Sequence, residues 1–211
     1  MESRIRLIVG LGNPGPDYAH TRHNAGFWLL DELVRRHGGA FSEERKFHGD
    51  VARTVIAGHD VRLLKPMTYM NRSGLAVQAF AAYLKVQPQE ILVVHDEIDL
   101  PVGVVRLKWS GGHGGHNGLR DVSRHLGEDY RRLRIGVGKP QDNRDVIDYV
   151  LKRPTAEEQP LLDAAVAAAA DAVPVMLRDG FERAMQMLHS RETVPKPYRK
   201  TQAAGEGNPV Q

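Results

Sequence analysis

The fold is decided between residues 5 and 26, by the apolar run Ile5-Arg6-Leu7-Ile8-Val9, the glycine-rich Gly10-Leu11-Gly12-Asn13-Pro14-Gly15 and the polar Thr21-Arg22-His23-Asn24-Ala25-Gly26. The apolar run predicts a buried strand, and the glycines predict a tight loop after it. Ligands of open α/β sheets bind at the carboxyl ends of such strands, where this loop presents Asn13. Histidine has an ordinary pKa of about 6.5 and suits a base at neutral pH, so His23 is a candidate catalytic residue.

Alternating strand and helix patterns extend this start into an α/β fold. We expect a single domain with a mixed, mostly parallel, twisted sheet and helices on both of its faces. The expected strands lie near 4–10, 50–57, 60–65, 91–95, 104–109 and 133–138, the second and third forming a hairpin. The expected helices lie near 24–37, 72–85, 117–126, 144–151, 155–178 and 179–189. Thr155 and Glu158 predict a capping box for the long helix, which Pro174 is expected to kink or shorten.

The composition is typical of a globular protein. The 211 residues are 41% hydrophobic and 26% charged, enough for one domain, which we place at 1–190. The composition of 191–211 predicts a disordered tail. With no cysteine, the chain has no disulfide, thiol nucleophile or zinc–thiolate site. No apolar run approaches the roughly 20 residues of a membrane span, and no secretory segment precedes the first strand, so we expect a cytoplasmic protein.

The charge is compatible with a polyanionic partner. The net charge is +3 and the isoelectric point about 9.2. Five arginines lie within fifteen residues, and they indicate either such a partner or a solvated helix face. They are Arg120, Arg124, Arg131, Arg132 and Arg134.

The glycines of the first loop also match the dinucleotide-binding fingerprint Gly-x-Gly-x-x-Gly. That fingerprint needs a helix that opens within the glycines, whereas Pro14 and Pro16 flank Gly15 and the helical pattern begins only near Asn24. No second strand supplies the acidic residue that holds the ribose. We therefore discount a nicotinamide cofactor.

An acidic cluster ends another expected strand, in His95-Asp96-Glu97-Ile98-Asp99. A carboxylate there can accept a hydrogen bond from an imidazole and stabilise the imidazolium. Two alternatives are a polar strand-end turn and a metal site formed by Asp96, Glu97 and Asp99.

Two further segments combine loops with helix starts. In Lys65-Pro66-Met67-Thr68-Tyr69-Met70-Asn71-Arg72-Ser73-Gly74, Asn71 or Ser73 can cap a helix, or Asn71 can order a water or a substrate amide. In Lys108-Trp109-Ser110-Gly111-Gly112-His113-Gly114-Gly115-His116-Asn117-Gly118, the glycines let backbone N–H groups approach an anion. Asn117 can cap the next helix, and the His113/His116 pair is a weak metal candidate.

A histidine, an acidic partner and several amides, without a serine elbow or a P-loop, indicate activation of water. Together these segments and Leu133-Arg134-Ile135-Gly136-Val137-Gly138 resemble the bacterial peptidyl-tRNA hydrolases, in the family's order and over residues 4–190. The resemblance implies hydrolysis of the ester between a peptide and the 3′ ribose of tRNA, by a monomer that needs no metal or cofactor.

The resemblance also implies roles for individual residues. His23 is expected to be the general base, Asp96 to keep it basic, and Asn13 to recognise a blocked substrate. The peptide and the tRNA 3′ end are expected to contact Tyr18, Tyr69, Asn71 and Asn117. Lys108 and Arg134 match positions that bind the 5′ phosphate of the acceptor stem. In the loop after Gly138 the basic candidates are Lys139 and Arg144. A non-catalytic RNA-binding module of the same fold is the alternative.

Overall fold

The computed structural model describes residues 4–140 and 145–190. Within these ranges one seven-stranded sheet has the order β2-β3-β4-β1-β5-β7-β6. The strands are β1 (Leu7–Gly10), β2 (Ser42–Glu44), β3 (Gly49–Ile56), β4 (His59–Pro66), β5 (Ile91–Glu97), β6 (Val105–Trp109) and β7 (Arg131–Gly136). The helices are α1 (Ala25–His37), α2 (Ser73–Leu84), α3 (Asn117–Leu126), α4 (Val146–Val150), α5 (Gln159–Asp179) and α6 (Phe181–Ser190).

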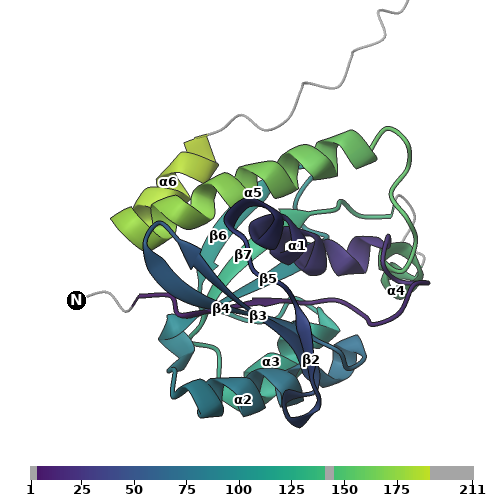
Figure 1. Cartoon of the computed structure of the whole chain (residues 1–211). Coiled ribbons are helices and arrows are strands. Elements are labelled where there is room, and N and C mark those ends of the chain that lie inside the picture. The colour runs from purple at the N-terminus through teal and green to yellow at the C-terminus, as the bar shows by residue number, and fades with distance from the viewer. Residues whose placement is uncertain (1–3, 141–144, 191–211) are drawn as a thin grey trace, which may run out of the picture.

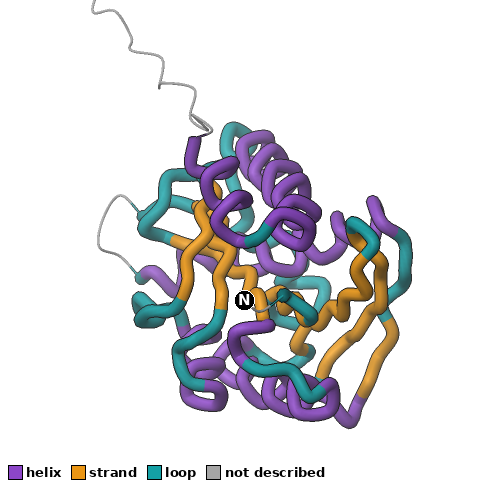
Figure 2. The backbone as a smooth tube through the Cα atoms, turned by 90° about the vertical axis from the view of Figure 1, so that its left-hand side faces the viewer, coloured by secondary structure: helices purple, strands orange, loops and turns teal. Residues whose placement is uncertain are grey.

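Helices cover both faces of the sheet, as expected. Helices α1, α5 and α6 pack on one face and α2 and α3 on the other (Figure 1). Alternate residues of each central strand point to opposite layers: in β1, Ile8 joins the first cluster, while Leu7 and Val9 join the second. Figure 2 shows the strands between the two groups of helices. The core is therefore two apolar layers that hold the sheet rigid from both sides.

The expectation of a mostly parallel sheet is wrong in its proportions. Strand pairs β4–β1, β1–β5 and β5–β7 are parallel, but β2–β3, β3–β4 and β6–β7 are antiparallel. The parallel pairs form the centre and the antiparallel pairs the two edges. Between β5 and β6 only residues 98–104 reverse the chain, and so short a connection has no room for the crossover helix that a parallel strand requires.

The glycines of the first loop serve close packing rather than a cofactor. A Cβ on Gly10 would lie 2.4 Å from the carbonyl oxygen of Gly26, and one on Gly26 would lie 2.4 Å from the backbone nitrogen of Leu11. A Cβ on Gly12 would meet the ring of Phe27 at 2.8 Å. Helix α1 therefore starts in direct backbone contact with the end of β1, which places His23 beside the strand.

Other expectations differ from the structure in detail. The short β2 was not predicted. The capping-box hydrogen bonds between Thr155 and Glu158 do form, at 2.9 and 3.3 Å, just before α5. Helix α5 continues through Pro174 to Asp179, so the proline does not end it. Residues 191–211, for which we expect a disordered tail, lie outside the described residues.

Helix α5 is long and apolar enough to cross a membrane by length and composition, contrary to the expectation from the sequence. In the fold, however, its apolar side belongs to the core that it forms with α1 and α6. It is a core helix of the domain.

Candidate active site

A cleft of about 610 Å³ opens where β1 and β5 end. Seven of the nine predicted site residues line it: Asn13, Tyr18, His23, Tyr69, Asn71, Asp96 and Asn117. The other two, Lys108 and Arg134, lie on β6 and β7. Asn13 follows β1 and Asp96 ends β5, and these parallel neighbours bring both residues to the carboxyl edge of the sheet.

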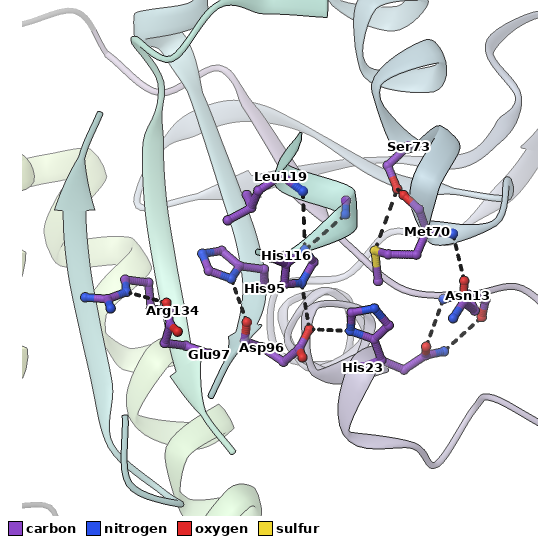
Figure 3. Close-up of polar contacts among 12 residues, drawn as sticks. Asn13, His23, Met70, Ser73, His95, Asp96, Glu97, His116, Leu119 and Arg134 are labelled. Atoms are coloured by element: carbon purple, nitrogen blue, oxygen red, sulfur yellow. Dashed lines mark hydrogen bonds and ion pairs between the residues drawn. The ribbon is translucent and has the colours of Figure 1, made fainter. Parts of the chain in front are cut away.

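His23 and His116 share one carboxylate oxygen. The Nδ1 atom of His23 and the Nε2 atom of His116 each lie 2.9 Å from Oδ1 of Asp96 (Figure 3). Asp96 is 2% exposed, so its negative charge depends on these two donors. With Nδ1 of His23 donating to the carboxylate, the lone pair of a neutral His23 is on Nε2. The imidazole therefore has the tautomer that a base requires.

The same contacts shift the pKa values of both groups. Burial lowers the pKa of His23, but the charge of Asp96 and its hydrogen bond raise that pKa by more, so it lies above its ordinary 6.5. Burial raises the pKa of Asp96, and the charges and hydrogen bonds of His23 and His116 lower it by more. Asp96 remains ionised, and it makes His23 a stronger base than an isolated imidazole.

The orientation of His116 follows from a second role. Its Nδ1 accepts the backbone N–H groups of Gly118 at 3.1 Å and Leu119 at 3.3 Å, so His116 is the N-cap of α3. With Nδ1 accepting, Nε2 carries the proton that is donated to Asp96. The expectation that Asn117 caps this helix is wrong, because the residue before it takes both free N–H groups.

Asn13 is fixed by two sets of hydrogen bonds, one from its side chain to Met70 and one from its backbone to Asn24. Its Oδ1 accepts the backbone N–H of Met70 at 2.8 Å, which leaves its amide NH₂ group as the donor available to the cleft. The side chain of Asn24 accepts from the backbone N–H of Asn13 at 2.9 Å and donates to its carbonyl at 3.0 Å. Asn13 is therefore a fixed, buried hydrogen-bond donor near His23.

The remaining amides and tyrosines lie at the rim. Tyr69 is 62% exposed, and Asn71 is exposed in the short helix η3 (Met70–Arg72). Neither Asn71 nor Ser73 caps α2, since the Ser73 hydroxyl donates to the carbonyl of Met70. The side-chain oxygen of Asn117 accepts from Arg120 at 3.1 Å. These rim groups surround the histidine without contacting it in any interaction found in the described part of the chain.

Lys108, Arg132 and Arg134 lie on the same face of the β6–β7 pair. Lys108 is opposite Arg132 in the strand register, and Arg134 lies two residues after Arg132 on the same strand. Lys108 is exposed, whereas Arg132 is buried and donates to the carbonyls of Gly111 and Gly112. Arg134 donates from Nε to Glu97 at 3.0 Å (Figure 3).

The solvated-helix explanation therefore fails for Arg131 and Arg132, which are buried on β7. Lys139 pairs with Asp99, and Arg144 lies outside the described residues.

The metal alternatives do not fit the donors that the fold provides. Glu97 and Asp99 are each engaged by a cation, and His113 accepts a backbone N–H of its own loop. Within residues 4–140 and 145–190, the group that could hold an ion is His23, Asp96 and His116. There Nε2 of His116 carries a proton because its Nδ1 caps α3, so it has no lone pair for a metal. The geometry fits a hydrogen-bonded triad.

The comparisons with known proteins identify the family of this chain. The family model "Peptidyl-tRNA hydrolase" matches residues 7–196.

The chain belongs to the peptidyl-tRNA hydrolase family.

Relatives with that name are 58% identical over 190 residues in Halorhodospira halophila and 52% identical over 192 residues in Neisseria gonorrhoeae. These alignments cover 90% of this chain and 98% and 100% of the relatives. The crystal structure of the peptidyl-tRNA hydrolase from Acinetobacter baumannii superimposes with a TM-score of 0.88 at 47% identity, covering 92% of this chain and 99% of that one.

Sequence reasoning missed three residues that organise this peptidyl-tRNA hydrolase site. They are His116, considered only as a metal ligand; Asn24, the clamp on Asn13; and Arg22. The buried Arg22 guanidinium donates to the carbonyls of Tyr149, Lys152 and Arg153 at 3.0–3.3 Å and pairs with Glu158 at 2.5 Å. Arginine and asparagine directly beside the histidine were the available signal, but their partners are distant in sequence.

Proposed function

We propose that this chain hydrolyses the ester between a peptide and the 3′ ribose of tRNA, and so returns tRNA for reuse. The observation that carries the proposal is the pair of hydrogen bonds to Asp96, which orient His23 with Nε2 as its basic atom. Membership of the peptidyl-tRNA hydrolase family supports the choice of substrate. We assign the activity to residues 1–190, acting as a cytoplasmic monomer.

The reaction requires one base and one set of donors. Nε2 of His23 takes a proton from water as the water oxygen bonds to the ester carbonyl carbon. Asp96 stabilises the imidazolium that forms, and base catalysis of this kind contributes roughly 10²–10⁴-fold. The bond to the ribose oxygen then breaks, and His23 returns the proton to that oxygen. The products are a free peptide carboxylic acid and tRNA.

Asn13 is the amide best placed to bind the substrate carbonyl. It is 6% exposed, and Met70 fixes its NH₂ group as a donor to the cleft, so it needs no reorganisation when negative charge develops on the carbonyl oxygen. Asn71 and Asn117 at the rim suit the peptide backbone and the tRNA 3′ end, with Tyr18 and Tyr69 beside them. The chemistry uses no metal or cofactor.

The acceptor stem would bind outside the cleft. Lys108 and Arg134 lie on one face of the antiparallel pair β6–β7 at an edge of the sheet, and both are cations of the kind that neutralise phosphate. Such contacts supply affinity and position without reading bases, so we assign them the 5′ phosphate.

The test is release of peptide from an N-acetylated aminoacyl-tRNA in the presence of EDTA. Wild type should cleave this ester and leave the unblocked aminoacyl-tRNA intact, and His23→Ala should lose at least about 10²-fold in kcat. His113→Ala is the matched control, because this half-buried histidine lies in a nearby loop but does not line the cleft. Binding of tRNA by a folded wild type that cleaves nothing would instead favour the RNA-binding module.

A further inference from the structure

Exposed apolar side chains are concentrated in the catalytic cleft. Over the described residues, six large hydrophobic side chains are exposed, and three of them, Tyr69, Val146 and Ile147, line this cleft. Val146 is 42% and Ile147 57% exposed, both on α4. Solvent-exposed apolar groups gathered at one site indicate a surface that is covered when a ligand binds.

Helix α4 forms an aliphatic wall of the cleft. Besides Val146 and Ile147, the wall contains Val150 of α4, Leu151 directly after this helix, and Ile98 directly after β5. The polar groups of the cleft belong to other elements: the loop after β1, η3, the end of β5 and the start of α3. The cleft thus provides hydrogen-bonding groups for an ester. The wall on α4 can bind a substrate group through dispersion and the hydrophobic effect.

The wall is tied to the catalytic histidine. Arg22, the residue before His23, donates to carbonyls at the end of α4 and just after it, and its guanidinium lies 4.2 Å from the ring centroid of Tyr149. The backbone N–H of Arg22 also donates to the carbonyl of Lys152 at 3.1 Å. The wall therefore keeps a fixed position relative to the base instead of moving independently of it.

The covalent structure of the substrate determines which of its groups can reach this wall. In an aminoacyl ester, the carbonyl carbon attacked by water is bonded directly to the α-carbon that carries the side chain. Once His23 and Asn13 position the carbonyl, that side chain must lie within a few ångströms of it. An aliphatic surface suits an aliphatic side chain, whereas a nucleobase would leave its donors and acceptors unpaired there.

We propose that α4 is the specificity wall for the side chain of the peptide's C-terminal residue, favouring branched aliphatic over small or charged side chains. The inference rests on the proposed hydrolase function and adds the class of substrate that the cleft prefers. Ile147 is the main determinant, because it is the most exposed member of the wall on α4 and loses the most contact with water when a side chain covers it.

The test compares N-acetyl-leucyl and N-acetyl-glycyl esters carried on one and the same tRNA. Wild type should have the higher kcat/KM for the leucyl ester. Ile147→Ser should lower that kcat/KM by about fivefold to twentyfold and leave the glycyl ester within about twofold. Val55→Ser is the matched control, since Val55 is 58% exposed and lies on β3, outside the cleft. It should change neither value.

A second variant should gain a new substrate preference instead of losing one. Ile147→Asp should turn the preference toward an N-acetyl-lysyl ester, because the wall would then offer a carboxylate to the substrate's ammonium. Equal losses for the leucyl and glycyl esters in Ile147→Ser, or an unchanged ratio in both variants, would overturn the specificity wall while leaving the hydrolase intact. Failure of wild type to cleave any of the esters would overturn the proposed function itself.

Discussion

The side-chain oxygen of Asn13 accepts the backbone N–H of Met70 at 2.8 Å, across 57 residues of sequence. This contact decides which end of the amide meets the substrate. We predict that Asn13→Asp lowers kcat by about 10²–10³-fold, because it places a carboxylate where the carbonyl oxygen needs a donor. Single-turnover hydrolysis of an N-acetyl-aminoacyl-tRNA would measure the loss.

The two ends of that amide can be tested separately. Asn13→Asp retains the oxygen that accepts the N–H of Met70, so this contact should persist, and thermal unfolding would measure the cost of the buried carboxylate separately from the loss of the donor. Activity near wild type in this variant would show that Asn13 is not the donor.

The pH dependence of activity should report the His23–Asp96 contact. A base works when neutral, so kcat/KM of wild type should rise with pH through an apparent pKa above 6.5, since Asp96 raises the pKa of His23. In Asp96→Asn the charge is lost and burial, which lowers the pKa, remains. The residual activity should therefore be much lower, and its rise should move to lower pH. A shift to higher pH would contradict this assignment.

His116 should have separable effects on activity and stability. Both His116→Asn and His116→Ala remove the donor to Asp96, and each should lose about tenfold or more in kcat. Asparagine is a good N-cap and alanine a poor one, so only the alanine variant should also lose about 1 kcal/mol of unfolding free energy. Urea unfolding monitored by circular dichroism would distinguish them. Equal stability of the two variants would argue against the cap.

The binding of tRNA should weaken with salt through Lys108 and Arg134. Replacing either with alanine should lower affinity and reduce the slope of log K against log salt by about one. Arg45→Ala is the control, because Arg45 is an exposed cation that follows β2, at the opposite edge of the sheet. Titration of uncharged tRNA at several salt concentrations would measure all three. An unchanged slope for Lys108→Ala would place the phosphate elsewhere.

Gly26 should be intolerant of any side chain. A Cβ there would lie about 2.4–2.5 Å from backbone atoms of Leu11 and Val94, which cannot move without displacing two strands. We expect Gly26→Ala to cost more than about 3 kcal/mol of unfolding free energy. Gly112→Ala should cost less than about 1 kcal/mol, since nothing lies within 4 Å of a Cβ at that position. Urea titration of both variants gives the comparison.

The cleft could be predicted because each of its motifs is local and two of them end parallel strands. Asn13 follows β1 and Asp96 ends β5, and these strands are neighbours in the sheet, so their loops had to meet. The hairpin of β3 and β4 was likewise predicted, with its turn around Gly58-His59; the structure has the turn at Ala57-Gly58, where both residues have positive φ.

What the sequence did not reveal depends on contacts between distant segments. The sequence of the glycine loop does not predict that His116 caps α3 with one ring nitrogen and donates to Asp96 with the other. The β2 residues Ser42-Glu43-Glu44 have no apolar alternation, and their strand pairs with β3 through the backbone. We predicted a mostly parallel sheet because strands and helices alternate along the sequence. The seven residues between β5 and β6, however, are too few for a crossover helix, so the chain direction had to reverse there.

The anchorage of Arg22 also affects when the site can form. Its carbonyl partners lie 127–131 residues further along the chain, and Glu158 lies 136 further. Synthesis proceeds from the N-terminus, so the loop that carries His23 emerges from the ribosome long before the residues that fix it. The loop that carries the catalytic histidine is therefore fixed only after the 136 residues that separate Arg22 from Glu158 have also been made. A nascent chain of this protein is itself attached to tRNA, and it acquires a finished ester-cleaving centre only after these distant partners of Arg22 have been synthesised.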